Sequence, residues 1–211
     1  MTKRWLCGLT LAAVLAAPAY AVVEADRERL VATNECEGCD LSGATLGYLD
    51  LTGASLAGAN LTDTFLRFST FDGADLAGAD LTNATFLQSS AVGTSFLDAL
   101  MDHAGMEEGT MSGADFTGAT LVEARITRTN LRDAILVGVD LSGATINGAV
   151  LSGADLTGAN LTGVSIDRTG FTGANLTDAD LTGATLTATS LTSAIKCNTT
   201  MPDGTVDNSG C

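Results

Sequence analysis

A large apolar residue occupies every fifth position from Leu41 to Leu191, without one insertion or deletion. The 31 positions hold 19 Leu, five Phe, three Ile, three Met and Ala91. We call the residue at each of these positions the centre of a pentapeptide. The residue two places before each centre is small: it is Ala in 19 cases, and Leu49 is the only one larger than Val. Neither an α-helix nor a straight strand can bury this pattern. A step of five turns a side chain by about 140° on a helix, and on a strand it alternates between the two faces.

A coil of short extended segments does bury it. A spacing of two places the small residue and the large one on the same side of an extended segment. The residues that follow are often Ser or Thr and then Gly, and Gly stands at the second place after the centre in 16 of 31 repeats. Such residues turn the chain at a corner. Each pentapeptide therefore forms one side of a coil, with its small and large residues pointing inward.

The residue before each centre should point outward, and it indicates how many sides the coil has. It is Asp or Asn in 12 of 31 repeats. If every fourth repeat lies on the same side, the four sides hold 6, 0, 2 and 4 of these Asp and Asn residues. If every third repeat lies on the same side, the three sides hold 5, 3 and 4. The stronger clustering favours four sides. It predicts a ladder up one side formed by Asp40, Asn60, Asp80, Leu100, Thr120, Asp140, Asn160 and Asp180.

The stretch ADLTGANLTG at 154–163 resembles the tandem units of the pentapeptide-repeat proteins. The resemblance covers about residues 39–195. It implies an all-β fold, a right-handed quadrilateral β-helix. With four of the 31 repeats in each coil there are seven to eight coils, and the rod is about 37 Å long at roughly 4.8 Å per coil. It implies little about activity, because the members share a scaffold more than a function.

The N-terminal segment 1–21 predicts a signal peptide. Lys3 and Arg4 precede an apolar run from Trp5 to Ala17, and Ala19-Tyr20-Ala21 offers a small-x-small cleavage site. The run is too short to span a bilayer as a helix. The sequence therefore predicts an exported protein that is not inserted in a membrane after the signal is removed. The expected compartment is the periplasm, or the medium, or the thylakoid lumen in a cyanobacterium.

The four remaining cysteines lie at the two ends of the repeats: Cys36, Cys39, Cys197 and Cys211. We expect a capping helix and entry at 22–38, with the helix over Glu24–Glu35, then the β-helix at 39–195 and a loop at 196–211. The loop contains Pro202-Asp203-Gly204, which favours a turn closed by a disulfide. Both ends resemble those of exported pentapeptide-repeat proteins.

For Cys36 and Cys39 three interpretations are open: a structural disulfide, a redox dithiol and half of a zinc site. The disulfide is favoured. No second Cys-x-x-Cys or His pair completes a metal shell, and no thioredoxin-like pattern surrounds the cysteines. We expect no metal or other cofactor.

The charge balance excludes some partners. Without Lys3 and Arg4, eight basic residues would stand against 25 acidic ones, a net charge of −17. Such a rod is not expected to bind nucleic acid or anionic lipid. It would suit a mimic of DNA, because the family includes cytoplasmic proteins that bind DNA gyrase in this way. The predicted export argues against that alternative.

Local departures from the repeat are the candidate interaction sites. Between Ala84 and Gly113, apolar residues take outward places and Met fills three successive centres, which indicates either a binding patch or decay of the repeat. Phe65 and Phe68 form a second candidate patch. The four-sided stacking also places His103 beside Glu123 and Glu108 beside Arg128. The interaction-patch candidates are thus Phe65, Phe68, Leu87, Leu97, Leu100, His103 and Glu123.

Catalysis is disfavoured. A His–carboxylate pair suits a general base, but no nucleophile accompanies it, and a convex rod lacks a cleft. We therefore predict a non-enzymatic, exported scaffold that presents an acidic surface to a protein or a cell-envelope component. The alternatives are a DNA-mimicking inhibitor or protector of a topoisomerase-like enzyme and, as the weakest, an enzyme.

Overall fold

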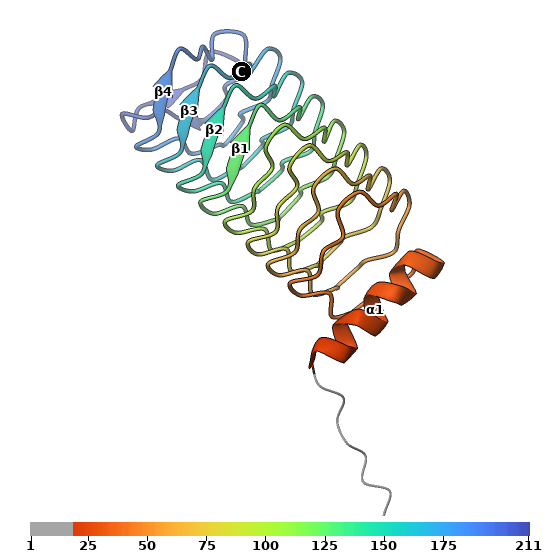
Figure 1. The fold of residues 1–211 in the computed structure, drawn as a ribbon. Coiled ribbons are helices and arrows are strands. Elements are labelled where there is room, and N and C mark those ends of the chain that lie inside the picture. Colours follow the sequence, from red (N-terminus) through yellow and green to blue (C-terminus); the bar gives the residue numbers. More distant parts are fainter. Residues whose placement is uncertain (1–18) are drawn as a thin grey trace, which may run out of the picture.

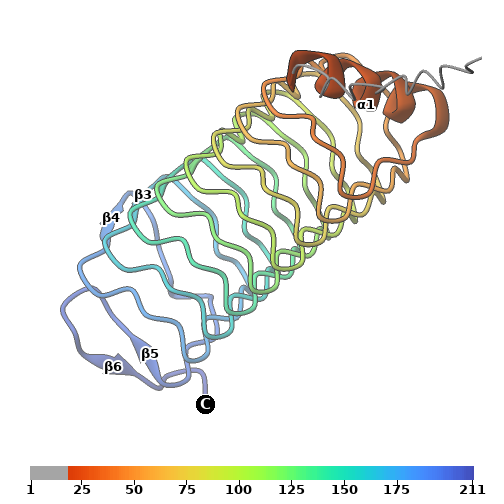
Figure 2. The ribbon, with the colours of Figure 1, turned by 90° about the horizontal axis from the view of Figure 1, so that it is seen from below.

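The computed structural model describes residues 19–211 and shows one long coil with a helix across its first end (Figure 1). Helix α1 spans Ala19–Thr33. Four short strands, β1 (Arg125–Thr127), β2 (Thr145–Asn147), β3 (Ser165–Asp167) and β4 (Thr185–Thr187), form a parallel sheet in the order β1-β2-β3-β4. Strands β5 (Thr199–Thr200) and β6 (Val206–Asp207) pair antiparallel at the other end, near the C-terminus (Figure 2). The expected all-β fold with one short helix is confirmed.

Successive turns of the coil are joined by parallel pairing at a constant offset. Each pairing between turns joins positions that are four pentapeptides apart, from Glu35↔Ser55 at the first turn to Asp180↔Thr200 at the last. One turn therefore takes four pentapeptides. The pairing starts at Glu35, slightly before residue 39, where we expected the β-helix to begin.

The ladder predicted from Asp40 to Asp180 is continuous, because each member pairs with the next. Several of its side chains form hydrogen bonds within their own turn or to the next turn of the coil. Asp40 Oδ1 accepts hydrogen bonds from the Ser42 backbone N–H at 3.1 Å and from Asn60 Nδ2 at 3.1 Å. Asp140 Oδ1 accepts one from Asn160 Nδ2 at 3.0 Å. The ladder thus stabilises the turns and links the coils.

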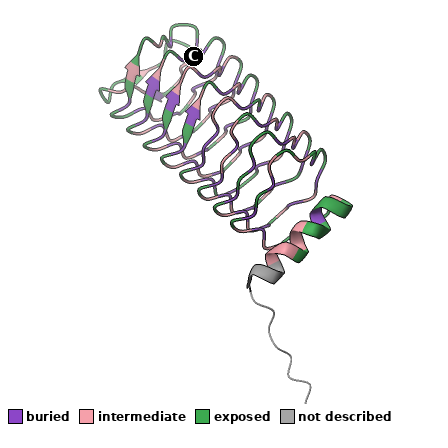
Figure 3. Ribbon diagram, viewed as in Figure 1, coloured by how far each residue is buried: buried purple, intermediate pink, exposed green. Residues whose placement is uncertain are grey.

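The inward positions form the core, and buried positions recur along each turn (Figure 3). Ala91, the one small centre, stands between Phe71 and Met111 in its column, and all three are fully buried. Large rings fill the neighbouring repeats: Phe86 and Phe96 meet edge to face at 6.0 Å between ring centroids. Where Ser or Thr replaces the small Ala, its hydroxyl donates to a backbone carbonyl, as Ser69 does to Leu46 at 2.7 Å.

The corners require a left-handed backbone. From residue 38 to residue 188, each second place after a centre has a positive φ, whether it is glycine or not. A Cβ is unfavourable in this region, which explains why Gly dominates there. Non-glycine residues at these corners hold their side chains outward at a cost in backbone energy.

Helix α1 begins before the predicted start at Glu24 and ends before the expected end at Glu35. It stops because Asn34 takes the left-handed conformation, φ 61°, and donates its N–H to Leu30 O at 2.8 Å. Leu30 is fully buried under the first turn. The carboxylate of Asp26 accepts the Asp40 N–H at 2.9 Å and so fixes the helix to the coil.

The predicted signal peptide lies outside the described residues except for Ala19–Ala21, which form the start of α1. At the other end, the expected disulfide between Cys197 and Cys211 closes the final loop. Lys196 Nζ lies 2.8 Å from Asp207 Oδ2 in the same loop. Over residues 19–211, no helix combines the length and the apolar character needed to cross a membrane.

Candidate functional site

One strip of the coil surface differs in chemistry from the rest. It follows the pentapeptide column that contains β1–β4, in which the residue directly before the large apolar residue is never Asp or Asn. We call it the arginine face. It comprises, from α1 upward, the outward residues Thr45, Gly47, Tyr48, Phe65, Arg67, Phe68, Thr85, Leu87, Gln88, Gly105, Glu107, Glu108, Arg125, Thr127, Arg128, Thr145, Asn147, Gly148, Ser165, Asp167, Arg168, Thr185, Thr187 and Ala188.

The end of the arginine face near α1 is aromatic. The rings of Tyr48 and Phe68 stack with 4.9 Å between their centroids and 15° between their planes. Tyr48 is 71% exposed, Phe65 50% and Phe68 41%. Tyr48 and Phe68 both stand at left-handed corners, with φ of 64° and 60°. Both rings are largely exposed, so their burial offsets little of the backbone cost at these corners.

The middle of the face is charged and paired. Arg125 Nε lies 2.9 Å from Glu107 Oε1, and Arg128 contacts Glu108. Gln88 donates to the other oxygen of Glu108 at 2.8 Å. The Arg128 guanidinium holds the pKa of Glu108 below its ordinary value.

Gly105 makes room for the Arg125–Glu107 pair. It occupies a pairing position where most other repeats carry a side chain. A Cβ there would lie 2.7 Å from Glu107 Oε2 and 3.0 Å from Arg125 Nη2. The pair therefore lies flat over the backbone and buries Gly105.

Farther up, Arg168 repeats the arrangement. Its guanidinium lies 2.7 Å from Asp167 Oδ2 and donates to Asn147 Oδ1 at 3.4 Å. Arg67, between the aromatic end and the charged middle, makes no ion pair with any residue of the described chain.

The arginine face collects the positive charge of the coil. Between residues 35 and 195, four of the five arginines lie on it, beside three acidic residues. The other outward positions carry 17 acidic residues and one arginine, Arg132. The face thus has a net charge of +1 on a strongly acidic rod.

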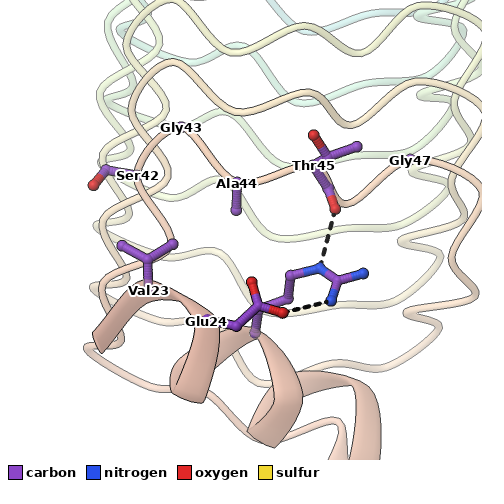
Figure 4. Close-up of a pocket in the computed structure, with 8 residues that line it drawn as sticks. Val23, Glu24, Ser42, Gly43, Ala44, Thr45 and Gly47 are labelled. Atoms are coloured by element: carbon purple, nitrogen blue, oxygen red, sulfur yellow. Dashed lines mark hydrogen bonds and ion pairs between the residues drawn. The ribbon is translucent and has the colours of Figure 1, made fainter. Parts of the chain in front are cut away.

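Three hollows follow one another along this face. The first, about 580 Å³, lies between α1 and the first turn, where Arg27 Nε donates to Thr45 O at 3.3 Å (Figure 4). The second, about 450 Å³, is lined by Phe65, Arg67, Leu87 and the Arg125–Glu107 pair among others. The third, about 350 Å³, lies between Arg128 and Arg168 and shares Arg128 with the second. The first hollow shares no lining residue with the second, and we call the series of three hollows the track.

Only some of the predicted patch residues lie together on one surface. Phe65, Phe68 and the half-buried Leu87 lie on the arginine face. Leu97 and Leu100 are exposed in two other columns. The stretch from residue 84 to residue 113 does not form one patch, because it wraps around more than one full turn of the coil.

His103 and Glu123 lie on a different corner from Phe68. His103 Nδ1 is 3.5 Å from Glu123 Oε2, and both side chains are more than half exposed. An exposed pair of this kind contributes at most about 1 kcal/mol. The His103–Glu123 pair is therefore an ordinary surface contact.

Cys36 and Cys39 are joined in a disulfide beneath α1, and they are 0% and 4% exposed. Thiol exchange needs an accessible sulfur, so this burial favours the structural role. Asp26 lies near both sulfurs, and these three residues form the one group of possible metal ligands within residues 19–211. Since both sulfurs are bonded to each other, they are not thiolate ligands.

Sequence reasoning missed Tyr48, Arg67, Arg125 and Arg168 as members of one surface. The signal for the corner residues is present in the sequence, because the four-pentapeptide spacing aligns one column of corner positions: Tyr48, Phe68, Gln88, Glu108, Arg128, Gly148 and Arg168.

Comparison with known families identifies the scaffold. The model of pentapeptide repeats matches eight copies over residues 35–96 and 98–195. The chain belongs to the pentapeptide-repeat family. A comparison with curated proteins gave no matching relative.

Solved structures of pentapeptide-repeat proteins are similar to this chain. HetL of the cyanobacterium Nostoc sp. strain PCC 7120, involved in regulation of heterocyst differentiation, is 26% identical over 86% of this chain and 98% of its own, with a TM-score of 0.40. QnrB1, a plasmid-mediated fluoroquinolone resistance protein, is 23% identical over 72% and 86%, with a TM-score of 0.45. Rfr23 of the cyanobacterium Cyanothece 51142 is 23% identical over 77% and 94%, with a TM-score of 0.37.

Proposed function

We propose that this pentapeptide-repeat protein is a non-enzymatic, exported scaffold that binds a protein or cell-envelope partner through its outer surface. We further propose a right-handed, four-sided coil of seven to eight turns as the form of that scaffold. The observation that carries the proposal is the filled interior. The inward Ala, Leu and Phe side chains are buried along the coil, so the variable side chains, and with them recognition, lie on the outside.

Export is supported by the sequence and by the cysteines. Residues 3–21 have the order of a secretory signal peptide. The two disulfides, Cys36–Cys39 and Cys197–Cys211, are typical of an oxidising compartment. The acidic columns would keep the exported rod soluble and prevent its sheet edges from pairing with other chains.

DNA mimicry is the weaker candidate. A mimic of a duplex presents negative charge around its circumference, whereas the arginine face interrupts that charge along one strip. The predicted export would also separate the protein from enzymes that act on DNA.

Fractionation tests export. The full chain is expressed in a Gram-negative host, and its compartment and N-terminal residue are determined by fractionation and mass spectrometry. We expect a periplasmic product that begins at Val22. Leu11→Arg, which places a charge in the apolar run, should leave the protein in the cytosol with its N-terminus intact. Cytosolic wild-type protein that still begins at Met1 would contradict export.

Capture with a chemical cross-linker tests the binding role. The wild-type protein is cross-linked in its own exported fraction, and the products are compared with those of an unrelated acidic protein of similar size. We expect a reproducible partner specific to this chain. Equal products from both proteins would contradict the scaffold role.

A further inference from the structure

We propose that the arginine face binds an extended acidic peptide segment of a partner protein, with apolar residues at one end and carboxylates at the other. This inference rests on the proposed scaffold function and names its binding surface and the chemistry of its partner. Three features of the face carry it: its charge, its composition and its length.

Charge complementarity sets the sign of the ligand. Four arginines stand on the face, and a guanidinium is the side chain best suited to bind a carboxylate through two parallel hydrogen bonds. Arg67 is free of ion pairs within the described chain, and it faces the second hollow. The other three pair with half-buried carboxylates on the face itself, but each of these arginine side chains is more than half exposed. Ion pairs with a solvent-exposed partner are weak, so these arginines can turn to an incoming carboxylate.

Composition distinguishes the face from a merely solvated surface. Tyr, Phe and Arg are enriched at protein interfaces, and Tyr and Arg are also enriched among the residues that dominate binding energy. On this face the two kinds are segregated. The aromatic rings and Leu87 lie toward α1, whereas Arg125, Arg128 and Arg168 lie toward the C-terminal end. A ligand therefore binds in one direction, with its apolar end beside Tyr48 and Phe68.

The track defines the length of the ligand. From Thr45 to Ser165 the face spans six steps between turns, or about 29 Å at roughly 4.8 Å per step. An extended peptide advances about 3.3 Å per residue. A peptide of about nine residues would therefore reach from the aromatic end to Arg168.

The surroundings disfavour larger anions. The 17 acidic residues on the other columns repel a bilayer or a nucleic acid, whose high charge density extends well beyond one strip. An extended peptide of about nine residues is narrow enough to contact only the arginine face. A second copy of this chain carries acidic columns too, but its aspartates are engaged in their own turns, as at Asp40.

The test uses the exported chain and three fluorescein-labelled nonapeptides: two leucines at one end followed by glutamates, the same peptide with glutamine for glutamate, and the same with lysine. Binding is measured by fluorescence anisotropy. We expect the acidic peptide to bind, the glutamine peptide to bind about tenfold more weakly and the lysine peptide not to bind. The double variant Arg125→Gln/Arg128→Gln should weaken the acidic peptide about tenfold. Arg132→Gln, the matched control on another column, should change it less than about twofold.

A second pair of variants tests the aromatic end. Tyr48→Gly/Phe68→Gly removes the rings and suits the left-handed corners, so circular dichroism should show an intact fold. It should weaken the leucine-containing peptide but not an all-glutamate peptide. Equal loss for both peptides would contradict the proposed direction of binding.

Other outcomes overturn the proposal. It fails if no peptide binds, if the lysine peptide binds equally well, or if Arg132→Gln costs as much as the double variant. It also fails if vesicles of anionic lipid bind in place of peptides, or if the wild type alone sediments as an oligomer. If the double variant still captures the partner of the wild type, the arginine face is refuted and the scaffold function stands.

Discussion

Two glycine-to-alanine changes separate the backbone role of glycine from its steric role. At Gly158 φ is 66°, and a new Cβ would meet nothing within 4 Å. Gly105 has an ordinary φ, but its new Cβ would lie 2.7 Å from Glu107 Oε2. The same methyl group therefore strains the backbone at one position and displaces an ion pair at the other.

The magnitudes follow from these geometries. Left-handed backbone costs about 1–2 kcal/mol for a residue with a Cβ, and the stiffer unfolded chain returns about 0.4–1 kcal/mol. Gly158→Ala should thus destabilise the fold by about 1 kcal/mol, or about 2–4 °C in Tm for a chain of this size. Gly105→Ala should leave stability unchanged within about 0.5 kcal/mol, because flexible side-chain ends can move away.

Urea unfolding followed by circular dichroism measures both variants, and anisotropy with the acidic nonapeptide follows the arginine face. Gly158→Ala should bind the peptide as the wild type does, whereas Gly105→Ala should change its affinity. The reasoning is refuted if Gly105→Ala is the more destabilising of the two, or if Gly158→Ala is as stable as the wild type.

Three further predictions concern stability. Leu156→Ala, at a fully buried centre, should lower the free energy of unfolding by about 3 kcal/mol, measured by urea denaturation; a loss below about 1 kcal/mol would show that the coil closes around the gap. Replacing both Cys197 and Cys211 by Ser should destabilise the C-terminal loop by about 3 kcal/mol, seen as faster hydrogen exchange there while the first coils keep their protection. The hydrogen bond from Lys196 holds the pKa of Asp207 at about 2, below its ordinary 3.8. Hydrogen bonds from Ser209 lower the same pKa, so the stability from these contacts is present above pH 3.8 and lost as pH falls toward 2. Lys196→Met, which removes the largest cause, should weaken that pH dependence in thermal unfolding; an unchanged profile in the variant would contradict it.

The repeat was predictable because its register is uninterrupted. One large centre in every pentapeptide left few alternatives to a coil, and the clustering of Asp and Asn at every fourth repeat predicted the pairing of Asp40 with Asn60. The ends were less well predicted. Helix α1 starts at Ala19 and not at Glu24, and nothing in the residues between them indicated that start. It stops before Asn34, whose left-handed conformation lies inside the expected span.

The site was harder to predict than the fold because it spans many turns. Phe65 and Arg125 are separated by three full turns of the chain, yet they stand in one column through Thr85 and Gly105. A local departure from the repeat, such as the stretch from Ala84 to Gly113, attracts notice in the sequence although its residues point in several directions. The opposite holds for Tyr48 and Arg168, which look ordinary in their own repeats and gain meaning only from their neighbours in space.

Because paired positions are always four pentapeptides apart, the number of residues between two surface groups determines whether they lie in the same column of the coil. Inserting one pentapeptide after Gly93 would keep the large and small residues of every repeat pointing inward, but it would move all downstream residues to the next column of the coil. Phe65 and Arg125 would then lie on adjacent columns, and the aromatic and cationic ends would no longer share one track. Inserting four pentapeptides would keep them aligned and separate them by one further step, about 4.8 Å. The angle between two surface groups and the distance between them can therefore be changed independently in this protein by the length of chain placed between them.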